Sequence, residues 1–221
     1  MKKRRFTEKE VLNLAKNAYE NGDANFKIKS ENCVLLVIDM QDEFVKPYWT
    51  PYWVPEATHQ VPKIKMLIDY CRNKKIPVIY TMFSKTNNYN DRPNTGKYMP
   101  NRFSNLNIDQ SEYFVNGKIY KELTPEPEDV VICKPSYGAF YNTSLETILR
   151  NLKRDTIIIC GTLTNYCCGT TARQGYERGF KVVFGSDITS TDDQSMQEPE
   201  LKVLRKGFAK VLNLKKIIEL I

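Results

Sequence analysis

The stretch Cys33-Val-Leu-Leu-Val-Ile38, followed directly by Asp39-Met-Gln41, decides the fold class of this chain. It is an uninterrupted run of β-branched and aliphatic residues, without alternation between polar and apolar positions. Such a run is typical of a parallel strand buried on both faces, because helices cover the two sides of a parallel sheet. The sequence therefore predicts a buried strand at 33–38 with an acidic residue at its carboxyl end.

The rest of the chain repeats this arrangement of apolar runs and helical patterns. Further strands are predicted at 77–83, 129–133, 156–160, 180–184 and 210–212, and helices at 62–73, 143–152, 166–178, 198–208 and 214–220. Thr143-Ser-Leu-Glu146 matches the pattern of a capping box that opens a helix. Alternating strands and helices indicate an α/β domain with a parallel, helix-covered sheet.

The chain divides into an arm and a domain. Residues 1–29 are predicted to form an N-terminal helical arm, with a short helix at 7–21 and Thr7 as its candidate N-cap. Residues 30–221 are predicted to form a single domain. Two of its segments, 44–62 and 84–128, are rich in turn-forming or aromatic residues, and we expect substrate contacts there.

The composition limits the classes of function. The 221 residues contain no run of the roughly 18 apolar residues that span a membrane, and the basic start is followed by polar residues rather than by the apolar stretch of a signal peptide. We therefore expect a cytoplasmic protein with no membrane partner. The formal net charge of +7 is spread over predicted helix faces without a nucleic-acid-binding motif, so we expect a small-molecule substrate and no nucleic acid.

Three predicted strands deliver reactive groups to one edge of the sheet. Asp39 follows the first strand, Lys134 follows the strand at 129–133, and Cys167 follows the strand at 156–160. Ligands of parallel sheets bind beyond the carboxyl ends of the strands, so the three groups converge where a substrate is expected. Each alone has a structural explanation: a turn-capping aspartate, a solvated lysine and a small buried cysteine. Their joint occurrence indicates catalysis.

The segment Gly161-Thr-Leu-Thr-Asn-Tyr-Cys-Cys-Gly-Thr-Thr-Ala172 places Cys167 near the start of a helix. Thr164 or Asn165 could cap this helix and leave Cys167 in its first turn, where unpaired N–H groups and the helix dipole favour a thiolate. Lys134 nearby would lower the thiol pKa further, and Asp39 could accept its proton. The same N–H groups could stabilise an oxyanion.

The other cysteines and the single histidine carry no clear metal or disulfide pattern. Four cysteines lie at or within predicted strands and helices: Cys33, Cys71, Cys133 and Cys160. Cys168 is expected in the core, and the rival interpretation, a redox disulfide with Cys167, is opposed by helical geometry. There is no Cys-x-x-Cys pair, and His59 is alone, so we expect reduced thiols, no metal and no other cofactor.

At these residues the sequence resembles the isochorismatase-like cysteine hydrolases, over about residues 30–213. The motifs that carry the resemblance are Val37-Ile-Asp39-Met-Gln41-Asp-Glu-Phe44, Lys134-Pro-Ser-Tyr-Gly-Ala-Phe140-Tyr-Asn-Thr143-Ser-Leu145, and the block from Ile159 through Cys167 to Ala172, with Asp187 after the fifth strand. The resemblance implies a three-layer α/β/α, Rossmann-like fold with a six-stranded parallel sheet. It also implies assembly into a homodimer or homotetramer.

The resemblance further implies the chemistry. It makes Asp39, Lys134 and Cys167 a catalytic triad, with a cis peptide between Thr162 and Leu163 and an oxyanion hole formed by the backbone N–H groups of Leu163 and Cys167. In the implied reaction Cys167 attacks an amide or ureido carbonyl, and ammonia or an amine leaves. Water activated by Asp39 then hydrolyses the thioester.

Two features narrow the choice within this family. Isochorismatases, which cleave a vinyl ether, characteristically lack the cysteine, whereas Cys167 is present here. The family's nicotinamidases hold a metal with an Asp and several His residues, but His59 is the only histidine and none lies between Ser84 and Asn94. The resemblance therefore points to metal-free amidohydrolases, similar to N-carbamoylsarcosine amidase, ureidoacrylate hydrolase or biuret hydrolase.

Substrate contacts are predicted from the two irregular segments and from the loop after Lys134. The candidates are Phe44, Trp49, Trp53, Arg102, Tyr137 and Phe140, with Tyr52 and Tyr98 in the same segments. Arg102 could hold a substrate carboxylate with two hydrogen bonds or lie on the surface, and the aromatic residues at 49–53 could form a lid or a subunit interface. Two other functions stay open: an ether or ester hydrolase with Cys167 as a spectator, and a catalytically silent protein that binds a metabolite.

Overall fold

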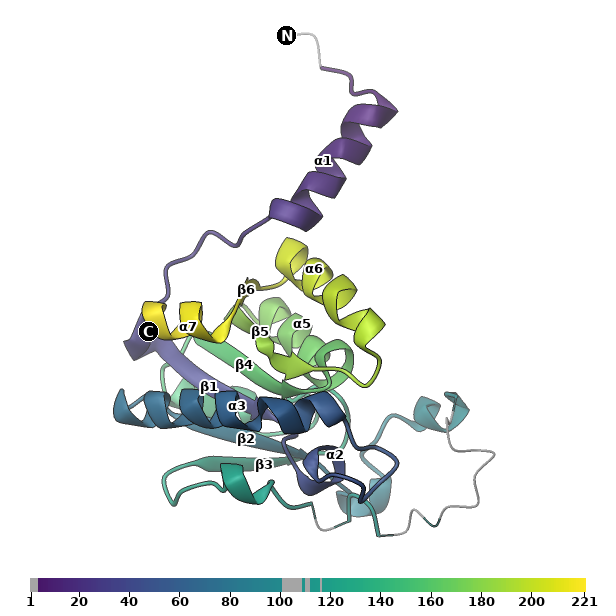
Figure 1. Ribbon diagram of the computed structural model, residues 1–221, viewed down its shortest axis with the longest axis vertical. Helices are drawn as coiled ribbons and strands as arrows, with labels where there is room; N and C mark the ends of the chain where they lie inside the picture. The colour runs from purple at the N-terminus through teal and green to yellow at the C-terminus, as the bar shows by residue number, and fades with distance from the viewer. Residues whose placement is uncertain (1–3, 101–108, 110–111, 116) are drawn as a thin grey trace.

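The computed structural model describes residues 4–100, 109, 112–115 and 117–221, and a parallel sheet forms its centre (Figure 1). Its strands are β1 (Cys33–Ile38), β2 (Val78–Phe83), β3 (Val130–Lys134), β4 (Thr156–Thr162), β5 (Lys181–Ser190) and β6 (Lys210–Leu212). They pair in the order β3-β2-β1-β4-β5-β6, and each pairing is parallel. The predicted α/β class and six-stranded parallel sheet are confirmed.

The predicted central run lies at the centre of the sheet as β1, and all of its residues are buried. It pairs with β2 on one side, Leu35 opposite Val78, and with β4 on the other, Val37 opposite Cys160. The chain builds outward from β1 to β3 and then returns to place β4 on the other side of β1. Such a reversal of strand order opens a ligand crevice beyond the carboxyl ends of the strands.

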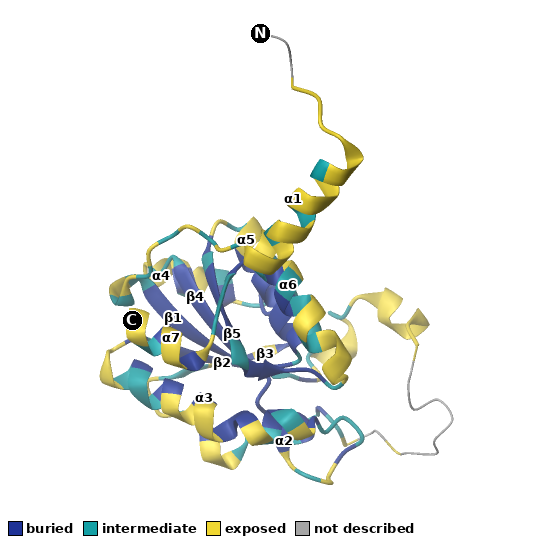
Figure 2. Cartoon of the chain, turned by 45° about the horizontal axis from the view of Figure 1, so that its top comes forward, coloured by how far each residue is buried: buried dark blue, intermediate teal, exposed yellow. Residues whose placement is uncertain are grey.

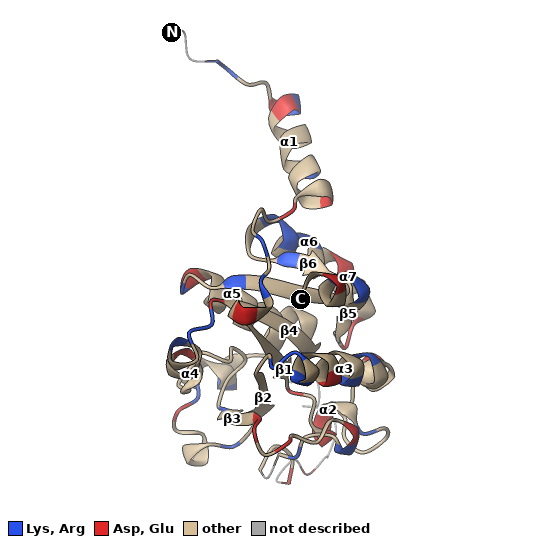
Figure 3. Ribbon diagram, turned by 90° about the vertical axis from the view of Figure 1, so that its left-hand side faces the viewer, with Lys and Arg blue, Asp and Glu red and all other residues tan. Residues whose placement is uncertain are grey.

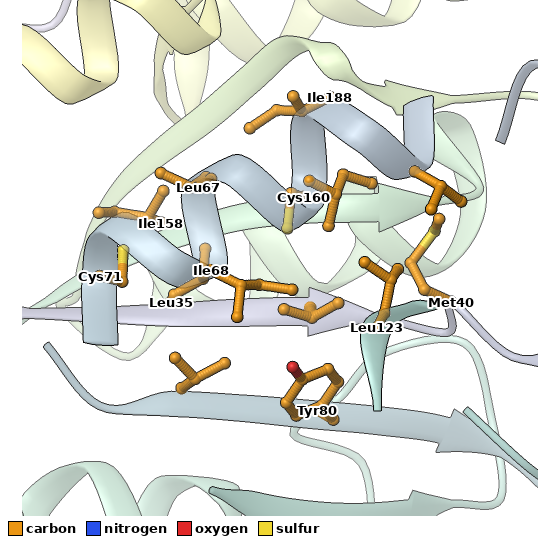
Figure 4. Close-up of a cluster of buried hydrophobic side chains, with 14 of the residues drawn as sticks. Leu35, Met40, Leu67, Ile68, Cys71, Tyr80, Leu123, Ile158, Cys160 and Ile188 are labelled. Atoms are coloured by element: carbon orange, nitrogen blue, oxygen red, sulfur yellow. The ribbon is translucent and has the colours of Figure 1, made fainter. Parts of the chain in front are cut away.

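Helices cover both faces of the sheet. On one face lie α3 (Pro55–Asn73) and α7 (Leu214–Leu220), and on the other lie α4 (Leu145–Asn151), α5 (Gly169–Glu177) and α6 (Gln197–Gly207). Alternate β1 residues enter the two cores: Leu35 packs in the α3 core shown in Figure 4, and Leu36 in the α5 core. Burial is therefore concentrated on the strands and on the inner sides of the helices, as Figure 2 shows.

Several element boundaries differ from the sequence expectations. The helix predicted at 62–73 begins at Pro55, because proline fits the first turn of a helix. The strand predicted at 180–184 continues to Ser190. A π-helical segment, η5 (Thr164–Cys168), precedes α5 and replaces the first turn of the helix predicted at 166–178.

The capping box predicted at 143–146 does not form. Thr143 Oγ1 accepts a hydrogen bond from Leu145 N–H at 3.2 Å and donates one to the Ala139 carbonyl at 2.5 Å. Glu146 instead pairs with Arg150 of its own helix and with Arg178. These ion pairs compete successfully with the backbone N–H group that a capping box would satisfy.

The helix α1 (Glu8–Asn21) projects away from the domain at the top of Figure 1. It begins with a capping box between Thr7 and Glu10, which confirms Thr7 as its N-cap. None of its residues is buried, and its contact with α6 includes Lys206 Nζ at 3.9 Å from the centroid of the Tyr19 ring. The division into an arm at 1–29 and a domain at 30–221 stays a prediction.

The remaining helical segments of the described residues are short. They are α2 (Asp42–Val45), η1 (Ser30–Asn32), η2 (Asn87–Tyr89), η3 (Asn94–Tyr98), η4 (Lys121–Leu123) and η6 (Gln194–Met196). In the part of the chain that the structure describes, no helix has the length and apolar character needed to cross a membrane. Figure 3 shows Lys and Arg interleaved with Asp and Glu along α3. Along α6 the acidic residues lie in the first turn, and basic residues lie in the last turn.

Candidate active site

Asp39 lies directly after β1 and is fully buried. Its φ of 50° is in the left-handed region, which costs a non-glycine residue on the order of 1 kcal/mol. The neighbouring strand β2 holds it there: Asp39 N–H donates to the Thr81 carbonyl at 3.1 Å, and Thr81 Oγ1 donates to Asp39 Oδ1 at 2.7 Å. The direction of the carboxylate is therefore fixed from the adjacent strand.

Lys134 is the last residue of β3 and is also fully buried. Its Nζ lies 2.7 Å from Asp39 Oδ2 and donates a hydrogen bond to the Ser136 carbonyl at 2.9 Å. Burial by itself would lower the pKa of Lys134, but its interactions with Asp39 and Cys167 outweigh the effect of burial, so the pKa is raised. The lysine therefore stays protonated beside the carboxylate.

Cys167 lies in η5, beyond the end of β4, with 3% of its surface exposed. Burial raises the pKa of its thiol to about 12. The charge of Lys134 acts to lower this pKa, whereas that of Asp39 acts to raise it. Both side chains hydrogen-bond with the thiol. The expectation of a thiol with a lowered pKa was wrong, because desolvation outweighs the nearby lysine. The resting site thus holds a protonated thiol against a carboxylate that could accept its proton.

The approach of β4 to β1 depends on Gly161. Its φ of 117° is in the region that favours glycine, and a Cβ atom there would lie 2.0 Å from the Ile38 carbonyl oxygen. Any side chain would therefore push the end of β4 away from the end of β1. This close contact brings the segment that carries Cys167 next to Asp39.

The segment between β4 and Cys167 differs from the predicted capped helix start. Leu163 occupies the N-cap position, Asn165 Oδ1 accepts a hydrogen bond from Thr191 Oγ1 at 2.6 Å, and Thr164 Oγ1 is buried with no hydrogen-bond partner among the described residues. Neither predicted cap forms. The Thr162–Leu163 peptide bond is cis. The assignment of the Leu163 and Cys167 N–H groups to an oxyanion hole stays a prediction.

The other thiols lie in different surroundings. All six cysteines are free, including the adjacent Cys167 and Cys168. Cys168 is fully buried in the α5 core, as expected, and burial raises the pKa of its thiol. Cys71 and Cys160 are buried in the α3 core, shown in Figure 4. Cys167 therefore differs from these cysteines in its contact with a buried ion pair.

Aromatic side chains form a series of ring contacts that reaches the neighbour of Cys167. We call Phe44, Phe83, Phe114, Tyr137 and Tyr166 the aromatic wall. Phe44 contacts Phe114, Phe114 contacts Phe83, and Phe83 stacks on Tyr137 at 6.3 Å between centroids and 13° between planes. Tyr137 in turn lies 5.3 Å from the Tyr166 ring. Two predicted contact residues, Phe44 and Tyr137, thus belong to one series of ring contacts.

The predicted tryptophans contact aromatic residues that are not part of the aromatic wall. Trp49 is 42% exposed and contacts Tyr113 edge-on at 6.3 Å. Trp53 contacts Tyr48 at 4.7 Å and donates a hydrogen bond from Nε1 to Thr58 Oγ1 at 2.9 Å. The structure therefore gives Trp53 a role in holding the loop before α3.

Phe140 lies apart from the wall, whereas Tyr52 contacts Phe114 of the wall at 5.1 Å between ring centroids. Phe140 packs in the α5 core against Phe180, 5.7 Å between centroids, and Arg102 lies outside the described residues. His59 lies on the exposed side of α3, 3.3 Å from Glu56 Oε2. Within the residues that the structure describes, no three His, Cys, Asp or Glu side chains are grouped as metal ligands.

Sequence reasoning missed two residues that shape the site. Thr81 orients the Asp39 carboxylate, and Gln41 holds the end of β2 through hydrogen bonds to both the N–H and the carbonyl of Phe83, at 2.8 and 3.1 Å. A signal for Thr81 existed: it is the residue of β2 that lies opposite Ile38, directly before Asp39. Finding it requires the strand order, which the local pattern does not contain.

The sequence profile of the isochorismatase domain matches residues 33–216, a range that contains Asp39, Lys134 and Cys167. The chain belongs to the isochorismatase family. Membership confirms the resemblance inferred from the sequence motifs. It makes the protein a member of a hydrolase family. It does not identify the type of bond that is cleaved or the substrate.

Curated relatives of this isochorismatase-family protein carry different activities in their names. Nicotinamidase 3 of Arabidopsis thaliana is 29% identical over 201 residues, 88% of this chain and 89% of that protein. The ureidoacrylate amidohydrolase RutB of Methylorubrum extorquens is 38% identical over 87 residues, 39% of this chain and 35% of that protein. The isochorismatase of Bacillus subtilis (strain 168) is 30% identical over 168 residues, 76% of this chain but only 50% of that protein.

Solved structures share the fold of this isochorismatase-family protein. A cysteine hydrolase from Pseudomonas syringae pv. phaseolicola 1448A has a TM-score of 0.78 and 27% identity, and the match covers 90% of this chain and 97% of that one. N-carbamoylsarcosine amidase from Thermoplasma acidophilum has a TM-score of 0.64 and 24% identity, and covers 83% and 96%. The second likeness bears on the fold alone.

Proposed function

We propose that this isochorismatase-family protein hydrolyses a C–N bond of a small amide or ureido substrate, with Cys167 as nucleophile. The observation that carries the proposal is the contact of the Cys167 thiol with the Asp39–Lys134 ion pair, in which Nζ and Oδ2 are 2.7 Å apart and both side chains are fully buried. A nucleophile touching a base that is itself oriented by a third group is the arrangement that covalent catalysis needs.

Asp39 acts as the base. A thiol with a pKa of about 12 carries very little thiolate at neutral pH, so its proton must leave as the substrate is attacked. In the first step the proton passes from Cys167 to Asp39, the sulfur–carbon bond forms, and the carbonyl oxygen becomes an oxyanion. Lys134 keeps positive charge beside the developing thiolate and the carboxylate.

The covalent intermediate is then formed and removed. The C–N bond breaks, the leaving nitrogen takes the proton from Asp39, and a thioester on Cys167 remains. Water attacks the thioester and gives a proton to Asp39, the carbon–sulfur bond breaks, and that proton returns to the thiolate. The net reaction consumes one water and yields an acid and an amine or ammonia, and the Leu163 and Cys167 N–H groups are the proposed donors to the two oxyanions.

The amide class is supported by the nucleophile and by the relatives. Nicotinamidase 3 and RutB are named for amide hydrolysis, and the similar structure from Pseudomonas syringae is named a cysteine hydrolase. A thiol is a suitable nucleophile for an acyl carbon and has no role in a simple ether cleavage. The proposed activity is therefore that of a cysteine amidohydrolase that acts on a small molecule.

The test is ammonia release from a panel of ureido acids, biuret, nicotinamide and simple carboxamides. Cys167→Ala is compared with Cys168→Ala, which removes the same sulfur from the adjacent, core-packed residue. We expect release by wild type and by Cys168→Ala, and loss of about a thousandfold or more in Cys167→Ala. Equal rates for wild type and Cys167→Ala would remove Cys167 from the mechanism.

A second candidate function is hydrolysis of an ether or ester with Cys167 as a spectator. The similarity to the Bacillus subtilis isochorismatase favours it. This candidate predicts that Cys167→Ala cleaves a vinyl ether substrate as fast as wild type does. Mass spectrometry of the quenched reaction separates the two candidates, because only the thiol mechanism leaves an acyl group on Cys167.

A further inference from the structure

Glu43 is a buried carboxylate in α2, with 2% of its surface exposed. Each of its oxygens accepts one hydrogen bond, Oε2 from Gln41 Nε2 at 2.8 Å and Oε1 from Phe114 N–H at 3.0 Å. No Lys or Arg side chain of the described residues forms an ion pair with it. A carboxylate is costly to bury without a cation, and hydrogen bonds to both oxygens offset that cost. These two contacts therefore account for the burial of Glu43.

The two donors come from different parts of the chain. The Gln41 amide also bonds to the N–H and the carbonyl of Phe83, at the end of β2, at 2.8 and 3.1 Å. Phe114 lies 71 residues after Glu43 in the sequence, and its carbonyl accepts a hydrogen bond from Lys85 N–H at 2.7 Å. The buried carboxylate thus joins Phe114 to the end of β2 through a continuous set of hydrogen bonds.

The backbone of Phe114 has a conformation that its residue type disfavours. Its φ of 61° is in the left-handed region, where the Cβ atom of a bulky residue crowds the backbone. Residues persist in such conformations only where the surrounding structure holds them, and they cluster at functional sites. Here the N–H group is held by Glu43 and the carbonyl by Lys85. The position of Phe114 is therefore imposed by these contacts and not by its local preference.

Phe114 lies between Glu43 and the catalytic groups. Its ring contacts Phe83 edge-on, at 5.3 Å between centroids and 84° between planes. The Phe83 ring in turn lies 5.1 Å from Lys134 Nζ. Lys134 is fully buried and Cys167 is 3% exposed. The low solvent exposure of the catalytic groups therefore depends on a ring that Phe114 supports.

We propose that Glu43 is a positioning residue of the active site. By fixing Phe114 it keeps the Phe83 ring over Lys134 and keeps water away from the ion pair and the Cys167 thiol. Exclusion of water strengthens the electrostatic interactions on which the proposed proton transfer depends. This inference rests on the proposed function and adds to it a residue that acts through other side chains.

The variant Glu43→Gln tests the requirement for two accepting oxygens. An amide has only one accepting atom, so its NH2 group must face either Gln41 Nε2 or Phe114 N–H, and one hydrogen bond is lost in either orientation. Asp42→Asn makes the same chemical change at the adjacent residue, whose side chain is partly exposed. It is the matched control and should behave like wild type in both measurements below.

The first measurement is the rate at which iodoacetamide alkylates each cysteine at about pH 8, with each site assigned by tandem mass spectrometry. In Glu43→Gln water reaches Cys167, so the pKa of its thiol should move from about 12 toward its ordinary value of 9.0. Its alkylation should then accelerate about tenfold or more, because the thiolate is the reactive form. Cys71 and Cys160, buried in the α3 core, should react at their wild-type rates. No substrate is needed for this measurement.

The second measurement is hydrolysis of the amide or ureido compound that the panel identifies. In Glu43→Gln kcat should fall about tenfold with KM within about threefold, because the electrostatics of the reacting groups are weakened. Phe114→Leu should reproduce both the faster alkylation and the slower turnover. Adding Glu43→Gln to Phe114→Leu should change little further, since two changes that act through the same contact are not additive.

The alkylation pattern separates positioning from general stability. Equal acceleration at Cys167, Cys71 and Cys160 in Glu43→Gln would mean a loss of overall stability and would overturn the positioning role. Alkylation of Cys167 at the wild-type rate would overturn it as well. If Cys167 alone became more reactive but Cys167→Ala hydrolysed substrate as fast as wild type, the proposed function would fail, and the role of Glu43 in keeping water from the site would stand.

Discussion

Two ion pairs lie at the two ends of β3, and they are built differently. At the amino end Arg72 pairs with Asp129, directly before the strand, with 19% and 6% of the two side chains exposed. At the carboxyl end Lys134 pairs with Asp39, and neither side chain is exposed at all. Both pairs join the same strand, β3, to the rest of the domain. The differences between them therefore come from their surroundings and not from the strand itself.

The amino-end pair is surrounded by further partners. Arg72 also lies 3.0 Å from Glu126 Oε1 and 3.2 Å from the Tyr80 hydroxyl, and Asp129 Oδ2 accepts from Glu126 N–H at 2.8 Å. At the carboxyl end Thr81 Oγ1 donates to Asp39 Oδ1 at 2.7 Å, Lys134 Nζ donates to the Ser136 carbonyl at 2.9 Å, and both charged side chains contact the Cys167 thiol. Removing a pair from water costs more than it returns unless such partners are present. Both pairs have such partners, but one partner of the second pair is the Cys167 thiol, so the second pair is suited to chemistry.

The largest expected effect is a difference in activity between variants of Asp39 and Asp129. Asp39→Asn keeps the shape of the side chain but removes the base, so kcat/KM should fall about a hundred- to ten-thousandfold. Asp129→Asn makes the same chemical change at the amino end and should leave kcat/KM within about twofold. Steady-state ammonia release measures both. Similar losses in the two variants would mean that the Asp39 pair acts through the fold and not through proton transfer.

The second prediction separates the pairs by stability. Arg72→Met leaves Asp129 without its main partner and should lower the free energy of unfolding by about 2 kcal/mol, somewhat less than for a fully buried pair, while kcat/KM stays unchanged. Lys65→Met, which breaks an exposed pair with Asp69, should change the stability by less than about 0.5 kcal/mol. Urea unfolding measures both. If Arg72→Met lost activity under conditions in which the variant is fully folded, the two ion pairs would not differ in function.

The third prediction concerns the support of the carboxyl-end pair. Thr81→Val removes the hydroxyl that donates to Asp39 Oδ1 and preserves the shape of the side chain, so kcat should fall about tenfold, with KM within about twofold. Thr189→Val removes another buried hydroxyl, which donates to the Gly185 carbonyl at 2.6 Å, and should leave kcat unchanged. If the two variants lost activity equally, Thr81 would be only a packing residue.

The same comparison shows what the sequence could predict. The strands follow from apolar runs that each lie within a few residues, and parallel pairing then places Asp39, Lys134 and Cys167 at one edge. The support of that edge is not local: the Thr81 hydroxyl arrives from another strand. Likewise, the N-caps predicted at Thr164 and Asn165 do not form. Leu163 occupies the N-cap position of η5, and Asn165 Oδ1 accepts a hydrogen bond from Thr191 instead.

The packing of individual side chains is harder still to predict from sequence. Phe140 and Tyr137 are close in the chain, yet one packs in the α5 core and the other joins the aromatic wall. Desolvation of Cys167 likewise depends on how completely the surrounding elements close over it. These properties require packing that a one-dimensional pattern does not contain.

The smallest effect compares a thiol at each end of the sheet. Burial raises the pKa of Cys71, next to Arg72, to about 12, and that of Cys167 to about 12. Because each thiol holds its proton more tightly in the folded chain than at its ordinary pKa of 9.0, the stability it contributes is complete below about pH 9 and declines as pH rises toward 12. The free energy of unfolding should fall by up to about 1.4 kcal/mol per pH unit for each such thiol.

Cys71→Ala and Cys167→Ala should therefore each make this alkaline decline shallower, by a similar amount, although only Cys167→Ala abolishes activity. Cys133→Ala, which removes an exposed thiol, is the matched control. Urea unfolding at intervals between pH 8 and pH 11 measures the slopes. If wild type instead gained stability relative to Cys167→Ala as the pH rose toward 9, the folded site would already hold a thiolate at neutral pH. The proton would then have left before the substrate arrives, and Asp39 would no longer be needed to take it during attack on the carbonyl.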